Sequence, residues 1–143
     1  KEFVIADIPG LIEGAHEGSG LGHRFLGHVE RCKALLHLVD VTSTSLRKDY
    51  STIINELKHY DNNLAKKKQI VVLTKCDAIN AKQIDFAKKE LKALKINNVL
   101  GISAVTGENI VKLIRNLQDI VNINDVIEND LVHKDDSTNA WSP

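Results

Sequence analysis

The chain has no methionine, one tryptophan, two prolines and two cysteines, and aromatic residues make up 4% of it. The cysteines, Cys32 and Cys76, are far apart and have no C-x-x-C spacing, so neither a zinc knuckle nor a disulfide framework is indicated, and a reducing cytoplasm is expected. The formal net charge is zero, which argues against nucleic-acid binding through bulk charge. No apolar run approaches the roughly 18 residues of a membrane span, and no signal segment opens the chain.

What the chain does contain fits one globular domain. Its 143 residues are 43% hydrophobic and 27% charged, which is ordinary for a soluble protein. A native chain would begin with methionine, so we expect Lys1, which runs straight into an apolar stretch, to be the cut edge of a longer protein. No internal repeat is found.

Four short apolar runs predict buried strands, because they are continuous rather than alternating, as in parallel strands covered on both faces. Between them, apolar residues recur at helical spacing over 46–64, 84–94 and 110–121, and a shorter helix is expected over 24–33. Asn80, followed three residues later by Gln83, resembles a helix N-cap with its reciprocal side chain. The pattern predicts an α/β fold with a mostly parallel sheet and helices on both faces. The predicted strands are Phe3–Ala6, Ala34–Val39, Ile70–Leu73 and Val99–Ile102.

Ligands of such sheets bind at the carboxyl ends of the strands, which selects the segments DIPG, DVTS, TKCD and SAVTGEN. In DIPG, Asp7 can hold Mg²⁺ through a water, and the backbone N–H of Gly10 can approach a terminal phosphate. A turn or a helix cap explains an aspartate at this position equally well. The glycine-rich stretch continues to residue 22, and together with Asp7 it suggests a phosphate and metal site.

TKCD and SAVTG fit the recognition of a guanine base. The Asp77 carboxylate can accept hydrogen bonds from N1–H and the exocyclic amine of guanine, while the stem of Lys75 lies along the base. Ala104 is small enough to let a backbone N–H reach the guanine carbonyl, and Ser103 would brace the loop. An ordinary strand-to-helix loop is the alternative for TKCD, and SAVTG alone is a weak signal. Their order along the chain strengthens the guanine interpretation.

The stretch DIPGLIEGAHEGSGLGHRFLGHVERCKALLHLVDVTS closely resembles the Obg family of GTP-binding proteins, and TKCD and ISAVTGEN resemble its guanine-specificity motifs. The resemblance implies a P-loop NTPase-type fold, with residues 1–121 as a partial GTPase domain and 122–143 as a polar, flexible tail. It implies binding of GTP or GDP with Mg²⁺, slow hydrolysis, and a role with the large ribosomal subunit and its RNA in subunit assembly or stress signalling. It also implies a cytoplasmic protein, expected to be a monomer. The implied nucleotide-binding residues are Asp7, Gly10, Thr74, Lys75, Asp77, Ser103 and Ala104, with Asp7 also on Mg²⁺.

Two departures from the family pattern limit the expected activity. Thr74 stands where the family has asparagine, and a hydroxyl replaces only part of what the amide does. No G-x-x-x-x-G-K-S/T occurs in the chain, so the phosphate loop and its strand are expected upstream of Lys1. We therefore expect a parent GTPase whose isolated fragment binds nucleotide poorly and is inactive. The alternative is a non-catalytic truncated product that retains only a scaffold or ribosome-docking surface.

The missing strand would lie between the strands predicted at 3–6 and 34–39. We expect an open slot there, closure of the two strands onto each other, or detachment of the first one. Leu11 replaces the glutamine that orients water in many related GTPases, so the catalytic residue is unknown; Glu13, His16 and Glu17 are polar candidates or simply a solvated face. Two further groups are expected to be structural or solvated rather than functional: the histidines at 23, 28 and 37, and the lysines at 66–68, where an RNA contact is the alternative.

Overall fold

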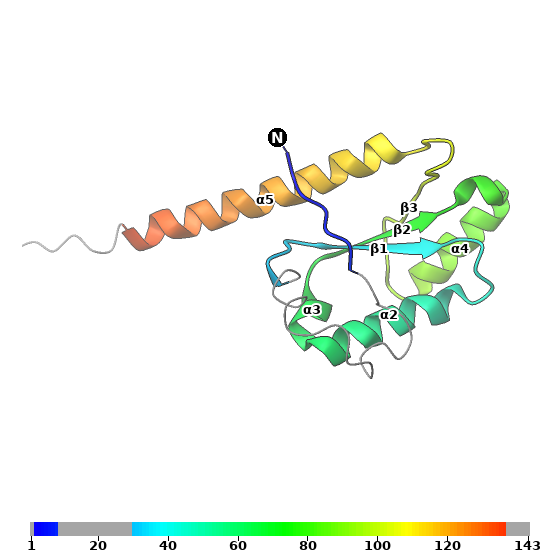
Figure 1. Ribbon diagram of the computed structural model, residues 1–143, viewed down its shortest axis with the longest axis horizontal. Coiled ribbons are helices and arrows are strands. Elements are labelled where there is room, and N and C mark those ends of the chain that lie inside the picture. Colours follow the sequence, from blue (N-terminus) through cyan, green and yellow to red (C-terminus); the bar gives the residue numbers. More distant parts are fainter. Residues whose placement is uncertain (1, 9–29, 137–143) are drawn as a thin grey trace, which may run out of the picture.

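The computed structural model describes residues 2–8 and 30–136, with side chains described as far as residue 123. These residues form a three-stranded parallel sheet in the order β1-β2-β3, with helices between the strands, so the fold is α/β as predicted (Figure 1). The strands are β1 (Leu35–Asp40), β2 (Gln69–Thr74) and β3 (Leu100–Gly101). The helices are α2 (Leu46–Tyr60), α3 (Asn62–Lys66), the short 3-10 helix η2 (Cys76–Ala78), α4 (Ala81–Ala93) and α5 (Ile110–Asp136).

The parallel pairing brings the carboxyl ends of the strands to one edge of the sheet. β1 and β2 pair over their full length, so that their last residues, Asp40 and Thr74, are partners. The short β3 pairs with the middle of β2, where Leu73 is the partner of Gly101. The three strands predicted at 34–39, 70–73 and 99–102 are confirmed with small shifts of their bounds, and the loops that follow them converge.

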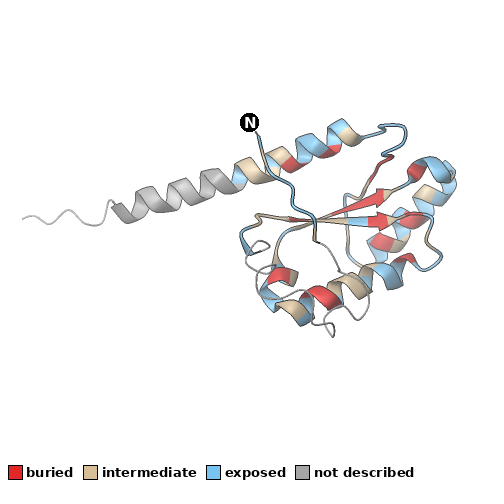
Figure 2. Cartoon of the chain, in the orientation of Figure 1, coloured by how far each residue is buried: buried red, intermediate tan, exposed pale blue. Residues whose placement is uncertain are grey.

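Helices cover both faces of the sheet, as the continuous apolar runs predict. Val72 and Leu73 are fully buried, and as successive strand residues they point to opposite faces. Leu73 packs in a core shared with Leu91 of α4, and Val72 packs in a second core with Leu113 and Leu117 of α5. The buried residues in Figure 2 accordingly lie on the strands and on the helix sides that face them.

Local capping explains where two helices begin. The predicted cap of α4 is confirmed, because the Asn80 side chain accepts from Gln83 N–H at 2.9 Å and the Gln83 side chain accepts from Asn80 N–H at 3.0 Å. The apolar spacing over 46–64 predicts one helix, but the structure divides it into α2 and α3 at Asp61. The Asp61 backbone is extended, and its carboxylate accepts from Asn63 N–H at 2.7 Å. Leu64 is nevertheless 2% exposed, so the apolar spacing predicts burial correctly across the break.

The strand predicted at Phe3–Ala6 is wrong, because residues 2–8 carry no secondary structure. Val4 is 93% exposed and Ile5 is 64% exposed, whereas Phe3 and Ile8 pack against separate apolar clusters of the domain. Of the three arrangements expected for this segment, the structure shows detachment from the sheet. The physical reason is that an apolar run becomes a strand only where a neighbouring strand accepts its backbone hydrogen bonds, and local sequence cannot supply that neighbour.

The last helix is longer than predicted. The helix predicted over 110–121 is confirmed, but α5 continues to Asp136 and projects beyond the sheet (Figure 1). The tail assigned to 122–143 is therefore helical over its first part, and its flexibility stays a prediction. Most of the helix expected over 24–33 lies outside the described residues. Among the helices of the described residues, none combines the length and the hydrophobicity of a membrane span.

Candidate functional site

The loops that follow β2 and β3 are joined at the carboxyl edge of the sheet. Ser103 Oγ donates to Asp77 Oδ1 at 2.6 Å, and the backbone N–H of Cys76 donates to the carbonyl of Ile102 at 3.1 Å. The structure thus brings TKCD and SAVTG together, as the order of the strands predicts. A carboxylate has about four acceptor positions, so the single bond from Ser103 orients Asp77 and leaves it able to accept from a ligand.

The loop after β3 is built around the hydroxyl of Ser103, which is completely buried. This Oγ also accepts from Thr106 N–H at 3.1 Å, and the Ser103 carbonyl accepts from Gly107 N–H at 2.9 Å. Gly107 has φ +78°, a conformation that glycine adopts without the steric cost of a side chain. Asn109 closes the loop by donating from Nδ2 to the Gly101 carbonyl at 2.8 Å. These bonds agree with the predicted bracing by Ser103.

Close packing fixes the start of the loop after β2. Cys76 is buried, and its Sγ lies only 2.9 Å from the position that a Cβ on Gly101 would take. Glycine at 101 therefore permits the strand and the η2 turn to approach each other. Burial raises the pKa of the Cys76 thiol, which keeps it protonated and makes it a packing residue rather than a nucleophile.

Lys75 adopts the left-handed backbone region with φ 60° and ψ 34°. For an L-residue this conformation costs roughly 1–2 kcal/mol, so the surrounding bonds must offset it. The Ala78 N–H donates to the Lys75 carbonyl at 3.0 Å, and the Lys75 ammonium forms a 2.5 Å ion pair with Asp40 Oδ2. The lysine is thus anchored through its backbone and through its side chain.

The sequence selects DVTS as a strand-end segment but gives Asp40 no role. In the structure, its Oδ1 accepts from Thr42 N–H at 2.9 Å and from Thr42 Oγ1 at 2.6 Å, while Oδ2 pairs with Lys75. The hydrogen bond from Lys75, followed by those from Thr42, lowers the pKa of Asp40 to about 2. The carboxylate is therefore ionised at any physiological pH. The sequence signal that could have revealed this role is that Asp40 directly follows one predicted strand and TKCD follows the next one.

The remaining residues expected at this edge are Thr74 and Ala104. Thr74 is half-buried at the end of β2, and its hydroxyl donates to the Val39 carbonyl across the sheet at 3.4 Å. Ala104 is exposed directly after Ser103. Thr74 precedes Asp77 by three residues, and Ala104 follows Ser103, which bonds to Asp77. The contact of either residue with a nucleotide stays a prediction.

The structure does not bring Asp7 into this group of residues. Asp7 is exposed in the segment without secondary structure, and its neighbour Ile8 packs against the cluster of Leu35, Leu57 and Leu64 near the opposite end of β1. Gly10 lies outside the described residues, as do the polar candidates between 13 and 17. Among the described residues, no group of three or more His, Cys, Asp or Glu side chains is placed to hold a metal ion.

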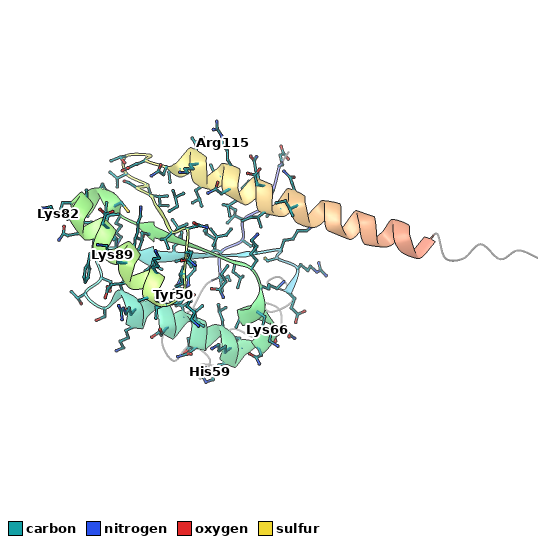
Figure 3. The ribbon with its side chains drawn as sticks, turned by 180° about the vertical axis from the view of Figure 1, so that it is seen from behind. Tyr50, His59, Lys66, Lys82, Lys89 and Arg115 are labelled. Carbon is teal, nitrogen blue, oxygen red and sulfur yellow. The ribbon has the colours of Figure 1, made fainter. Side chains whose placement is uncertain are left out.

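The surroundings of His37 are those of a structural side chain packed between the sheet and α2. Its ring stacks on Tyr50 of α2 at 4.8 Å between centroids, and Tyr50 lies against the sheet (Figure 3). Burial lowers the pKa of His37 to about 4, so the ring is neutral at physiological pH. Its Nδ1 is buried and has no hydrogen-bond partner. The histidines at 23 and 28 lie outside the described residues.

The lysines at 66–68 include one with a structural task. Lys67 Nζ donates to the carbonyls of Glu30 and Cys32 at 2.6 Å each, and so ties the segment before β1 to the end of α3. Figure 3 shows the labelled basic residues Lys66 and Arg115 on different sides of the molecule, carried by α3 and α5. An RNA contact at this run stays a prediction.

A comparison with known families decides the class of protein. The sequence model described as 50S ribosome-binding GTPase matches residues 1–75, just over half of the 143 residues. The chain belongs to the 50S ribosome-binding GTPase family. The match includes DIPG and the first two residues of TKCD, and membership of this GTPase family implies GTP binding. The parallel α/β sheet with helices on both faces is consistent with the P-loop GTPase fold.

Proposed function

We propose that this protein is an Obg-type member of its GTPase family, that it binds GTP and GDP, and that it acts with the large ribosomal subunit and its RNA in subunit assembly or stress signalling. The family match supports the GTPase class. The finer assignment rests on the D-I-P-G-L-I-E-G-A stretch that begins at Asp7. In the parent protein the activity would be slow hydrolysis of GTP.

The observation that carries the proposal is the 2.6 Å bond from Ser103 to Asp77, which unites the two base-recognition loops. In this arrangement Asp77 accepts from N1–H and the exocyclic amine of guanine, whereas adenine offers no such pair of donors. Lys75 covers the base with its stem, and the loop at Ala104 supplies a backbone N–H to the guanine carbonyl. Thr74 stands in for the usual asparagine at reduced strength.

For magnesium, the type of donor fits, but the structure places Asp7 away from the loops at the carboxyl edge, beside a residue that packs near the opposite end of β1. Mg²⁺ usually keeps several waters and is held by one or two carboxylates together with substrate phosphates, so a single exposed carboxylate such as Asp7 suffices on the protein side. When bound, the ion would offset negative charge on the phosphates. Asp7 would hold it through water, and Gly10 would offer its N–H to the terminal phosphate.

A non-catalytic role is the second candidate, and a specific observation favours it. The 143 residues contain no G-x-x-x-x-G-K-S/T, the loop whose amides and lysine bind phosphates. We therefore expect this chain by itself to bind nucleotide weakly and to hydrolyse none. In that form it would contribute a scaffold or a ribosome-docking surface.

The test uses the base alone, since the base-recognition loops are the part that is present. Guanosine and adenosine are titrated at millimolar concentration into the isotope-labelled chain, and the amide signals of Lys75, Asp77 and Ser103 are followed by NMR. We expect shifts with guanosine only. Equal responses to both nucleosides, or none to either, would contradict the proposal.

An Asp77→Asn variant sharpens this test. The asparagine amide can donate to the C2 carbonyl of xanthosine, where guanosine has an amine, so preference should move from guanosine to xanthosine. Asp85→Asn is the matched control, because Asp85 is an exposed residue of α4 that belongs to neither loop. It should leave the guanosine preference unchanged.

A further inference from the structure

The ion pair between Asp40 and Lys75 connects the end of β1 to the loop after β2. The last residues of the two strands are paired across the sheet, so the residue after β2 begins directly beside Asp40. Lys75 Nζ lies 2.5 Å from Asp40 Oδ2. The ammonium of Lys75 is therefore held at the Asp40 carboxylate, across the edge of the sheet.

The carboxylate that receives the lysine is itself held in place. Both donors of Thr42, the backbone N–H and the hydroxyl, bond to Asp40 Oδ1, and this leaves Oδ2 turned toward Lys75. Thr42 follows Asp40 by two residues, so this bracing is local and involves no atom of the lysine. Asp40 thus offers a fixed acceptor to a flexible side chain.

Stability alone does not account for this arrangement. The side chains of Lys75 and Asp40 are 63% and 37% exposed, and exposed ion pairs contribute little to folding. A free lysine stem populates many rotamers, and these must be lost when the stem lies against a base. A fixed acceptor at the far end of the stem reduces that loss before any ligand arrives.

We propose that Asp40 is a positioning residue for guanine binding, which acts by holding the Lys75 stem in the direction in which it covers the base. This inference rests on the proposed guanine site. Asp40 does not contact the base, and its effect passes entirely through Lys75. Base specificity belongs to Asp77, so loss of Asp40 weakens binding without changing which base is preferred.

The test measures guanosine affinity by NMR for Asp40→Asn, Lys75→Met and the double variant. Guanosine is used because it is uncharged, so removal of a negative charge has no long-range effect on it. Methionine keeps an apolar stem and removes the ammonium. Each single change should weaken guanosine binding about three- to tenfold, and the double variant should bind no more weakly than Lys75→Met alone.

Asp49→Asn is the matched control. Asp49 is exposed in the first turn of α2 and accepts a hydrogen bond from Ser43, but it does not contact Lys75. Its replacement should leave guanosine affinity unchanged, and thermal unfolding of all variants verifies that they fold.

The outcomes separate this inference from the proposed function. Unchanged affinity in Asp40→Asn, or a further loss when it is added to Lys75→Met, overturns the positioning role while Asp77→Asn still reports on the guanine site. If the unmodified chain shows no preference for guanosine, the proposed function fails and the positioning role fails with it.

Discussion

The loops at the carboxyl edge of the sheet and the N-terminal segment 2–8 show two ways in which a chain can be held. At the edge, Ser103 is completely buried and its Oγ bonds to two neighbours, so the loop geometry is fixed by directional contacts. In the segment, Phe3 and Ile8 pack against the domain, while Val4 is 93% exposed. An apolar sequence is therefore enough to attach a segment to the domain, whereas a defined loop geometry needs hydrogen-bonded neighbours.

The largest expected effect on the unfolding free energy comes from acid, because β1, which leads to the carboxyl edge, carries the largely buried His37. The folded-state pKa of His37 is lowered to about 4, below the usual 6.5, so below pH 6.5 the unfolded chain binds more protons. The stability that neutral His37 contributes should be fully present above pH 6.5. As the pH drops toward 4, the free energy of unfolding should fall by up to about 3 kcal/mol. Urea unfolding as a function of pH measures this decline.

Carboxylates also titrate in this range, so the contribution of His37 needs its own comparison. His37→Phe keeps an aromatic ring against Tyr50 and removes the titration, so its stability should fall less between pH 6.5 and 4. The exposed His59 is the matched control, and His59→Phe should retain the decline of the unmodified chain. Parallel pH profiles for His37→Phe and the unmodified chain would show that His37 is not the cause.

The next effect tests whether the carboxyl edge depends on bonds. Ser103→Ala leaves the Thr106 N–H without its partner and releases Asp77, which should cost about 1–3 kcal/mol of unfolding free energy. Ser45→Ala is the control, because Ser45 precedes α2 without a side-chain capping bond. Equal unfolding free energies for the two variants would mean that the buried hydroxyl does not organise the loop.

The smallest effect tests the N-terminal segment. Phe3 is partly buried against the cluster that contains Val72, so Phe3→Ala should cost about 1 kcal/mol in denaturant unfolding. Val4→Ala, next to it and exposed, should change stability by less than about 0.5 kcal/mol. If both variants match the unmodified chain, the segment is not held through Phe3.

The parts of the fold that were predictable are those that local pattern determines. Continuous apolar runs locate β1, β2 and β3, and the Asn80–Gln83 pair marks the start of α4. The run at 3–6 has the same local character, but pairing depends on a neighbour elsewhere in the fold. The break between α2 and α3 at Asp61 was not predicted either, because the apolar spacing continues through it.

For the candidate site, strand order was enough to predict that TKCD and SAVTG meet. It could not predict the Ser103–Asp77 bond or the pairing of Lys75 with Asp40, because both depend on side-chain directions across separate strands. Asp7 shows the converse. Its motif is the most characteristic of the chain, yet its place at a strand end depended on a strand that does not form.

The close approach of Gly101 to Cys76 has a consequence for how this protein can change its sequence. A side chain at 101 would meet the Sγ at 2.9 Å, and the buried thiol, with a bond to the Leu73 carbonyl at 3.5 Å, has little freedom to turn away. The two positions therefore cannot vary independently. A larger residue at 101 is easier to accommodate when a smaller one stands at 76, so we expect substitutions at these two positions of the carboxyl edge to be coupled.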